Sequence, residues 1–384
     1  MSRDSKNGSE ERQIKKRTIG TERKLTALSL FSGGGGMDLG VTEAGFDILA
    51  SVEIDPFCCE TLRTNIGMAE RRSRIIESDI RLINPQELLE SMELTTGELD
   101  LLFGGPPCQA FSQIGKRKSL DDERGILLFE MIRFAKIFKP KAILIEQVKG
   151  FLNATDGKGK PGGVFSLLLS ELEGLGYSTK WKVINSADWG VPQKRERVFI
   201  VSTSGPNKFR FPPPTHGPAG QTSLFFELKP FVTVGEALEG LGPPGLKNGD
   251  SSEGSSHIDV TPEGDRNRIH GVPEGDWLAR QFQLPATQRK NLCRKDTTKF
   301  RRLSRSESSL TLRCGEIFYH YSEDRYLTPR ECMRLHAYPD KYLLKGPIRG
   351  RSGRVLKLDQ HRQIANSVPP PVAKIIASAI VEVI

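Results

Sequence analysis

The sequence predicts an α/β protein built on a doubly wound, mostly parallel β-sheet, followed by a smaller, irregular and basic second domain. Short apolar runs alternate with helical patterns from residue 25 to residue 204. This alternation is typical of a parallel sheet covered by helices on both faces. After residue 204 the chain becomes rich in Gly, Pro, Ser and basic residues and loses its regular periodicity. At 384 residues, the chain is long enough for two domains.

Seven short apolar runs in the first part of the chain are expected to form strands. They lie at residues 25–31, 48–52, 74–76, 99–103, 142–145, 181–184 and 197–202.

Helices are expected between these strands, and each has a local signal. One begins at Met37, directly after four glycines. Pro56 opens another, at a first position that proline tolerates. Residues 123–138 carry apolar side chains at helical spacing and stop before Pro140. A further helix is expected over 165–175.

The second half of the chain is less regular. Residues 205–350 are expected to form the second domain, and residues 211–217 (FPPPTHG) are interpreted as a linker. Within this domain Thr328 is expected to cap a helix, with Pro329 and Glu331 completing the start signal. The final segment, 355–384, returns to apolar helical spacing. Residues 1–24 are expected to be a disordered basic tail.

Charge and cysteine usage restrict the function classes. The formal net charge of +9 and the pI near 9.2 favour a polyanionic partner, nucleic acid first and an anionic membrane surface second. A basic surface without a partner is the alternative. The six cysteines form no CxxC pair, so we expect no metal site and a reducing, cytoplasmic compartment. The sequence shows no apolar run of membrane-spanning length and no signal-peptide core, so we expect no membrane-spanning segment.

The glycine-rich turn after the first strand predicts a site for an adenosine-containing cofactor. Glu53 follows Gly33 by 20 positions (53 − 33), where a carboxylate can accept both ribose hydroxyls. A dinucleotide motif needs a third glycine where this chain has Asp38, and an anion there repels a phosphate. We therefore expect a cofactor without phosphates, and S-adenosylmethionine fits that description.

A lone cysteine and a carboxylate follow two neighbouring strands of the predicted sheet. Cys108 lies in the stiff loop GGPPCQAFS at residues 104–112, and Glu146 ends the next strand. A nucleophile and a proton donor or acceptor are the two groups that covalent catalysis needs. Arg195 and Arg197, at a third strand end, could lower the pKa of the thiol or hold a substrate. For each residue alone, a structural role in a loop or cap remains the alternative.

Together these motifs resemble those of the DNA (cytosine-5) methyltransferase family, and the resemblance covers residues 25–379. The matching stretches are FSGGGG at 31–36, Glu53, Asp79, PPCQ at 106–109, QKRER at 193–197, LTPREC at 327–332 and QIANSVPP at 363–370. The resemblance implies that the catalytic residues are Cys108, Glu146, Arg195 and Arg197. It implies that the cofactor is bound by Phe31, Gly33, Gly35, Gly36, Glu53, Ile54, Asp79, Ile80, Asn366 and Ser367.

The family resemblance also implies a reaction. S-adenosylmethionine would methylate C5 of a cytosine that has been flipped out of double-stranded DNA, through a covalent bond from Cys108. Residues 205–350 would recognise a specific DNA sequence, and residues 355–384 would pack back on the catalytic domain, 25–204. The chain would act as a monomer, without a membrane, in a bacterial restriction–modification system with a restriction endonuclease that acts on the same site.

Two residues depart from the family pattern. Gln147 stands where the family has Asn, so the amide that steadies the cysteine loop is one methylene longer. Ala365 stands where the family usually has Gly, which matters only if that backbone needs a positive φ.

Three alternative functions remain at this stage. They are a tRNA cytosine-5 methyltransferase of the same architecture, a catalytically weak protein that binds S-adenosylmethionine and DNA, and a NAD-dependent dehydrogenase, which Asp38 argues against.

Overall fold

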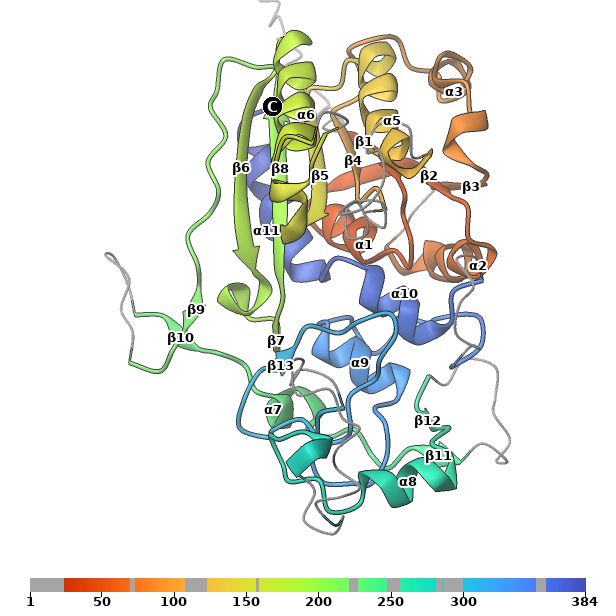
Figure 1. The fold of residues 1–384 in the computed structure, drawn as a ribbon. Helices are drawn as coiled ribbons and strands as arrows, with labels where there is room; N and C mark the ends of the chain where they lie inside the picture. The colour runs from red at the N-terminus through yellow and green to blue at the C-terminus, as the bar shows by residue number, and fades with distance from the viewer. Residues whose placement is uncertain are drawn as a thin grey trace, which may run out of the picture.

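A seven-stranded mixed sheet forms the larger part of the molecule (Figure 1). The structure is a computed structural model that describes residues 24–69, 73–107, 123–156, 159–220, 227–246, 256–280, 285, 300–349 and 357–384. The strand order is β3-β2-β1-β4-β5-β8-β6. The strands are β1 (Leu25–Leu30), β2 (Phe46–Glu53), β3 (Arg74–Glu77), β4 (Leu101–Gly104), β5 (Ala142–Val148), β6 (Ser178–Asn185) and β8 (Glu196–Thr203).

The predicted fold class is confirmed, with one reversal of direction inside the sheet. Strands β3, β2, β1, β4 and β5 pair in parallel, whereas β8 is antiparallel to both of its neighbours, β5 and β6. Six of the seven strands therefore run the same way. Each expected strand is present, with ends that differ by a few residues from the apolar runs in the sequence.

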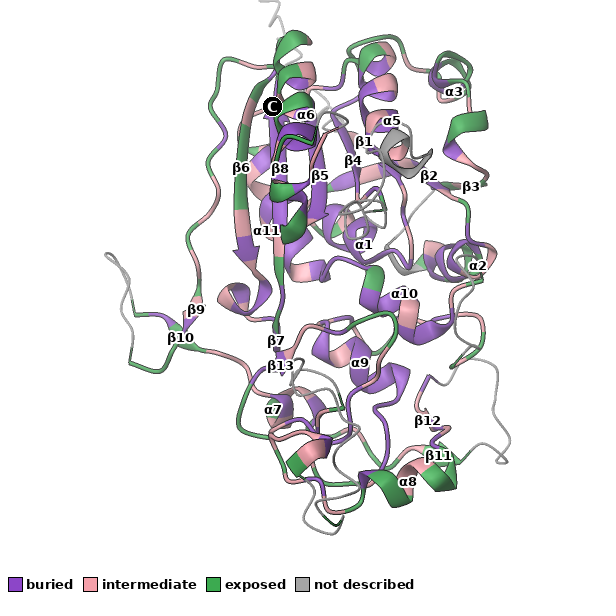
Figure 2. Cartoon of the chain, in the orientation of Figure 1, coloured by how far each residue is buried: buried purple, intermediate pink, exposed green. Residues whose placement is uncertain are grey.

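Helices cover both faces of this sheet. One face packs against α3 (Pro85–Ser91), α5 (Glu123–Phe138) and α6 (Gly163–Gly174). The other packs against α1 (Gly36–Glu43) and α11 (Pro370–Val381). Alternate strand residues serve the two cores, because successive side chains of a strand point to opposite faces. Figure 2 shows the buried strands between these layers.

The C-terminal helix α11 lies against α1, the first helix of the chain. The two helices approach so closely that a Cβ at Gly40 would clash with the backbone carbonyl of Pro370. Residues 360–381 are long and apolar enough to cross a membrane by length and composition alone, an exception to the expectation from sequence. This stretch contains two helices, with Pro369 between them, and 61% of its apolar window is buried.

Helices α2 (Pro56–Asn65) and α10 (Gln360–Asn366) lie between the sheet and residues 205–350, which we call the second region (Figure 1). Asp55 caps α2 by accepting hydrogen bonds from the backbone N–H groups of Phe57 and Cys58. Pro56 occupies the first turn, as the sequence predicts.

The second region is irregular and is held by short elements. Its helices are α7 (Val234–Leu238), α8 (Glu263–Ile269) and α9 (Pro329–Leu335). Its two-residue strands are β9 (His216–Gly217), β10 (Lys229–Pro230), β11 (Gly245–Leu246), β12 (Ile258–Asp259) and β13 (Ser309–Leu310), the last of which pairs with β7 (Gln193–Lys194).

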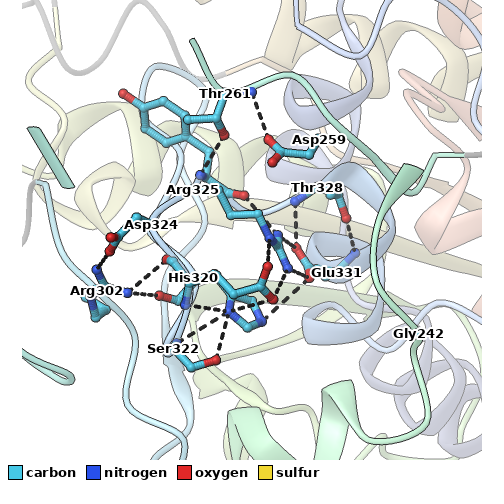
Figure 3. A network of polar contacts seen from close by, with 12 residues as sticks. Gly242, Asp259, Thr261, Arg302, His320, Ser322, Asp324, Arg325, Thr328 and Glu331 are labelled. Carbon is cyan, nitrogen blue, oxygen red and sulfur yellow. Dashed lines mark hydrogen bonds and ion pairs between the residues drawn. The ribbon is translucent and has the colours of Figure 1, made fainter. Parts of the chain in front are cut away.

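A buried polar network sits beside α9 (Figure 3). The Arg325 guanidinium donates to both carboxylate oxygens of Glu331, at 2.7 and 2.8 Å. Glu331 also accepts from the backbone N–H of Thr328, whose hydroxyl accepts from the N–H of Glu331. The predicted capping box is therefore confirmed. Although burial alone would raise it, the hydrogen bonds from Arg325 keep the pKa of Glu331 below its usual value.

Candidate active site

Glu146, near the carboxyl end of β5, is paired with Arg197 from the start of β8. The antiparallel register places Arg197 beside Val148, the last residue of β5. Arg197 Nε lies 3.0 Å from Glu146 Oε1, and the Glu146 residue is 9% exposed. Burial raises the pKa of Glu146, and the charges of Arg197 and Arg195 only partly oppose this. Such a carboxyl group keeps its proton to higher pH and is suited to share it with a substrate.

The loop that leads to Cys108 is anchored to the strand that carries Glu146. Strands β4 and β5 are paired neighbours, as the sequence predicts. Gln147 Nε2 donates to the carbonyl oxygen of Pro106 at 2.8 Å, and the Gln147 residue is 1% exposed. The longer amide side chain thus reaches the loop. Cys108 itself lies outside the described residues.

One cavity joins the glycine-rich loop to Glu146. It is lined by Ser29, Leu30, Phe31, Ser32, Gly33, Gly36, Met37, Asp38, Phe103, Gly104, Gly105, Glu146, Asn366, Ser367 and Val368. Three stretches that are distant in the sequence, around residues 33, 104 and 366, therefore meet in one place. A group bound by the glycine-rich loop would lie beside the Glu146 carboxyl group.

Glu53 is held by backbone N–H groups at the end of β2. Its Oε2 accepts from the N–H of Gly33 at 2.7 Å, and its Oε1 accepts from the N–H groups of Ile54 and Asp55 at 2.9 and 2.8 Å. Burial raises the pKa of Glu53, and these hydrogen bonds oppose the rise. Because a carboxylate oxygen can accept more than one hydrogen bond, the oriented group can still accept hydroxyl donors.

The glycine-rich turn departs from ordinary backbone geometry at its start. Phe31 has a φ of 56° and Gly33 a φ of 54°, both in the left-handed region. Glycine adopts this region without strain, whereas a residue such as Phe31 does so only where its surroundings hold it there. Since Phe31 lines the cavity, the strained residue belongs to the candidate site.

Asp38 places a buried carboxylate at the same cavity. Its two oxygens accept hydrogen bonds from the hydroxyl groups of Ser29 and Ser51, each at 2.7 Å, and the residue is 1% exposed. A carboxylate at this depth disfavours a phosphate and is compatible with a cation, because Coulomb interactions are strong where water is excluded. This carboxylate therefore fits a positively charged ligand without phosphates better than a phosphate-containing one.

Asp79, Ile54 and Ile80 lie around the ends of β2 and β3. The Asp79 carboxylate pairs with Arg81, whose Nη2 lies 2.6 Å from its Oδ2, and this hydrogen bonding lowers the pKa of Asp79. Ile54 is 45% exposed. In contrast, Ile80 is buried in the core, and its carbonyl oxygen accepts hydrogen bonds from Arg133 and from the N–H of Ile83.

Arg195 is buried among backbone carbonyl groups. Its Nη2 donates to the carbonyl oxygens of Ala365 and Ser367, at 2.9 and 3.0 Å, and its Nη1 donates to that of Leu312 at 3.4 Å. Burial, with the nearby charge of Arg197, lowers the pKa of Arg195 to about 9. These contacts connect Arg195 to the end of α10, and its place among the catalytic residues stays a prediction.

The second departure from the family pattern causes no strain. Ala365 lies inside the right-handed helix α10 and does not have a positive φ. The next two residues, Asn366 and Ser367, reach the cavity. Asn366 Oδ1 also accepts a hydrogen bond from the thiol of Cys314.

Sequence reasoning missed one polar residue that stabilises this arrangement, His336. His336 is fully buried, with its Nε2 3.0 Å from the Ser367 carbonyl oxygen and its Nδ1 2.9 Å from Gln193 Nε2. These partners fix one neutral tautomer, with the proton on Nε2, and burial holds the pKa of His336 well below its usual value. Gln193 belongs to the QKRER stretch, but nothing in the sequence pointed to His336.

Comparison with known proteins identifies the chain. The family model of C-5 cytosine-specific DNA methylases matches residues 25–382. The chain belongs to this family. It is a DNA cytosine-5 methyltransferase, as its motifs suggested, and the dehydrogenase alternative is excluded.

Similar proteins include several Type II methyltransferases. M.NgoFVII of Neisseria gonorrhoeae is 34% identical over 356 residues, which is 91% of this chain and 84% of that protein. M1.HphI of Haemophilus parahaemolyticus is 31% identical over 375 residues, 93% of this chain and 87% of the relative. M.AquIA of Picosynechococcus sp. is 44% identical over 230 residues, 58% of this chain and 90% of the relative.

Solved structures share the fold. A putative DNA modification methyltransferase encoded within an Escherichia coli prophage superposes with a TM-score of 0.68 at 22% identity, over 94% of this chain and 99% of that one. A Spodoptera frugiperda DNMT2 mutant gives a TM-score of 0.60 at 17% identity, over 93% and 99% of the two chains.

The contact between Gln147 and Pro106 can be tested with side chains of matched length. Gln147→Met keeps the length but removes the donor, and we expect it to lower kcat for methyl transfer about tenfold, because a buried carbonyl loses its hydrogen bond. Gln147→Asn keeps an amide and should retain more activity than the Met variant. Single-turnover rates would measure both, and a wild-type rate for Gln147→Met would contradict the assigned role.

The raised pKa of Glu146 predicts a pH-dependent stability. The folded protein holds this proton more tightly than the unfolded chain, whose carboxyl titrates near 4.5. Relative to Glu146→Gln, the wild-type free energy of unfolding should therefore fall as pH rises above that value. The fall should be about 1.4 kcal/mol per pH unit until the pKa of the folded state is reached, and the difference should then stay constant.

Urea unfolding at several pH values would measure this difference. Glu236→Gln is the control of opposite sign, because hydrogen bonds from Thr233 lower the pKa of Glu236. The contribution of Glu236 should be lost as pH falls. A wild-type advantage over Glu146→Gln that grows with pH would refute the assignment for Glu146.

Proposed function

We propose that this methyltransferase transfers a methyl group from S-adenosylmethionine to C5 of a cytosine flipped out of duplex DNA, through a covalent bond between Cys108 and C6. The observation that carries this proposal is the shared cavity, which is lined by both the glycine-rich loop and Glu146. It would place a cofactor beside the carboxyl group paired with Arg197. The anchored Pro106 lies two residues before Cys108 in the same loop.

The residues around the cavity suit S-adenosylmethionine. When bound, this cofactor supplies an electrophilic methyl group on a sulfonium cation. Glu53 would accept hydrogen bonds from the ribose hydroxyls, and Asp79, Ile54 and the backbone of Ile80 would surround the adenine. Asp38 would favour the positive charge and oppose a phosphate. The binding set also includes Phe31, Gly33, Gly35, Gly36, Asn366 and Ser367.

The chemistry requires C5 of cytosine to become nucleophilic. The Cys108 thiolate adds to C6, forming the S–C6 bond, while Glu146 gives a proton to N3 and electron density moves to C5. After C5 is methylated, a base removes the C5 proton, and N3 returns its proton to Glu146. The S–C6 bond then breaks, the C5–C6 double bond returns, and Cys108 leaves as the thiolate.

Arg197 and Arg195 have different roles in this proposal. Arg197 contacts Glu146 and would hold the base through its O2 atom. Arg195 would keep the end of α10 in place through the carbonyl groups of Ala365 and Ser367. Because a stacked base cannot reach a nucleophile, the cytosine must leave the duplex, at a cost of a few kcal/mol that contacts in the pocket offset.

A second cavity suits the DNA backbone. It has a volume of about 340 Å³ and is lined by Lys149, Asn185, Lys194, Glu196, Arg197 and Thr311. Arg197 is shared with the Glu146 site, so a nucleotide bound to Glu146 would bring its phosphates toward this cavity. The two lysines are about half exposed, and the pairing of Lys194 with Glu307 is loose, at 3.8 Å.

The wider assignment follows from the relatives and from the arrangement of the chain. The similar Type II methyltransferases support a sequence-specific enzyme of a restriction–modification system, with a restriction endonuclease acting on the same site. We propose a catalytic domain at 25–204, a target-recognition domain at 205–350, and a segment at 355–384 that packs back on the former. We further propose a monomer that works in the cytoplasm.

The covalent mechanism predicts a trapped adduct. In the presence of S-adenosylmethionine, duplex DNA containing 5-fluorocytosine should form a stable bond to the wild type, because after methyl transfer the fluorine at C5 cannot be removed as a proton. Cys108→Ala should form none and should lose roughly 10³-fold or more in methyl transfer. Its equilibrium binding of S-adenosylmethionine should stay within about twofold of wild type, since the thiol is not part of that donor set.

The controls for this experiment separate the alternatives. Cys314→Ala removes a second thiol near the cavity and should still form the adduct. Labelled tRNA is offered in parallel: transfer to tRNA alone would favour the tRNA enzyme, and binding without any transfer would favour a catalytically weak binding protein. Substantial methyl transfer by Cys108→Ala would disprove the nucleophile assignment.

The proposed phosphate contacts predict a change in salt dependence. Lys194→Ala and Lys149→Ala should each weaken DNA binding and reduce the slope of log K against log salt by about 0.9 for each phosphate that is no longer neutralised. Fluorescence anisotropy with a labelled duplex would measure these slopes. Lys180→Ala, at an exposed position on the edge strand β6, is the matched control and should keep the wild-type slope. Equal slopes for all variants would exclude phosphate binding at this cavity.

A further inference from the structure

Two tyrosine side chains from the segment after α9 reach the glycine-rich loop. Tyr342 Oη donates to the carbonyl oxygen of Gly34 at 2.9 Å, and Tyr338 Oη approaches the same oxygen at 3.4 Å. Both side chains are buried: Tyr338 is 4% exposed and Tyr342 is 1% exposed. A loop near the start of the chain is therefore fixed by residues about 300 positions later.

The tyrosines also explain two of the four glycines. A Cβ atom at Gly35 would clash with the hydroxyl group of Tyr342, and one at Gly36 would clash with that of Tyr338 and with the Val368 carbonyl. By contrast, a Cβ at Gly33 would meet nothing within 4 Å. Packing inside the protein therefore favours glycine at positions 35 and 36, and at Gly36 the clash includes the backbone carbonyl of Val368.

The turn that presents Tyr338 is strained. Ala337, which follows the C-cap His336 of α9, has a φ of 56° at a position where glycine is usual. The N–H of Tyr338 donates to the carbonyl of Met333, and the N–H of Ala337 donates to that of Arg334, which closes the helix. These two hydrogen bonds, together with the buried ring of Tyr338, hold the turn.

The same segment is attached to α2, which follows Glu53. Asn65 Nδ2 donates to the carbonyl of Leu343 at 2.7 Å, and the N–H of Leu343 donates back to Asn65 Oδ1 at 3.0 Å. The N–H of Lys345 donates to the hydroxyl of Thr61 at 2.9 Å. Residues 338–345 therefore contact both the glycine-rich loop and α2.

We propose that Tyr342, assisted by Tyr338, is a positioning residue for the glycine-rich loop. Both tyrosines belong to the second region, and by holding the loop they increase its affinity for S-adenosylmethionine. This inference rests on the proposed function. A run of four glycines has many accessible backbone conformations, and ordering it costs conformational entropy. By holding the Gly34 carbonyl before the ligand arrives, the tyrosines reduce the entropy lost on binding. They touch neither the base nor Glu146, so they act on binding and not on the chemical step.

The test compares tyrosine-to-phenylalanine variants, which remove one hydroxyl and keep the ring. Isothermal titration of the apo protein with S-adenosylmethionine should give a Kd about fivefold higher for Tyr342→Phe, and a larger increase for the Tyr338→Phe/Tyr342→Phe double variant. The KM for the cofactor should rise in parallel. The kcat at saturating cofactor and duplex DNA should stay within about twofold of wild type, because the reacting groups are intact.

Tyr177→Phe is the matched control. The Tyr177 hydroxyl is also buried and donates to a backbone carbonyl, that of Pro140, at 2.7 Å, but in the packing between α6 and the sheet. It should lower the Tm about as much as Tyr342→Phe and leave the Kd for S-adenosylmethionine unchanged. Hydrogen exchange of the 33–36 amides, measured without cofactor, should speed up in Tyr342→Phe and not in Tyr177→Phe.

The possible outcomes distinguish a failure of this inference from a failure of the proposed function. Wild-type affinity in both Tyr342→Phe and the double variant, with unchanged exchange of the loop, would overturn the inference and leave the proposed function standing. A loss of kcat at unchanged Kd would overturn it as well. A wild-type protein that binds no S-adenosylmethionine would overturn the proposed cofactor, and the inference with it.

Discussion

The candidate site depends on the reversed direction of β8. In an all-parallel sheet, the strand beside β5 would end, and not begin, next to Glu146. Because β8 is antiparallel, its first residues lie beside the last residues of β5, and Arg197 reaches the Glu146 carboxylate. The same reversal carries the preceding residue pair, β7, toward β13 of the second region. One change of strand direction thus places a cation on the carboxyl group and connects the two parts of the molecule.

The two arginines of the QKRER stretch are close in sequence but differ in burial and therefore in role. Positions 195 and 197 are two apart, so in extended backbone their side chains point the same way. Arg195 is 1% exposed and surrounded by carbonyl oxygens, whereas Arg197 is partly exposed and paired with a carboxylate. Burial lowers the pKa of Arg195 to about 9, yet it stays charged at neutral pH. The buried guanidinium of Arg195 can stay charged because backbone carbonyl groups take the place of the water molecules that would otherwise hydrate it.

Much of the sheet could be predicted from the sequence, because its strands are apolar runs with clear breaks. The residues at the strand ends, such as Glu53 and Glu146, could be named for the same reason. The direction of β8 could not, because apolar periodicity carries no information on which way a strand runs. The positions of Tyr342 and Gly34, 308 residues apart, depend on how the second region packs, and no local pattern records that. The depth of Arg195 could not be predicted either, because a motif shows charge but not burial.

The second region has few regular elements, yet it holds the side chains of Tyr338 and Tyr342 in defined positions against the glycine-rich loop. Its helix α9 has seven residues, too few to be stable alone. Both of its ends are fixed: the capping box and Arg325 hold the first turn, and the hydrogen bonds of Ala337 and Tyr338 close the last. Buried ion pairs contribute little net stability compared with apolar packing, but they demand one geometry. We therefore regard the Arg325–Glu331 pair as a device for orientation. It fixes where α9 starts, and so where Tyr338 and Tyr342 meet the loop beside Glu53.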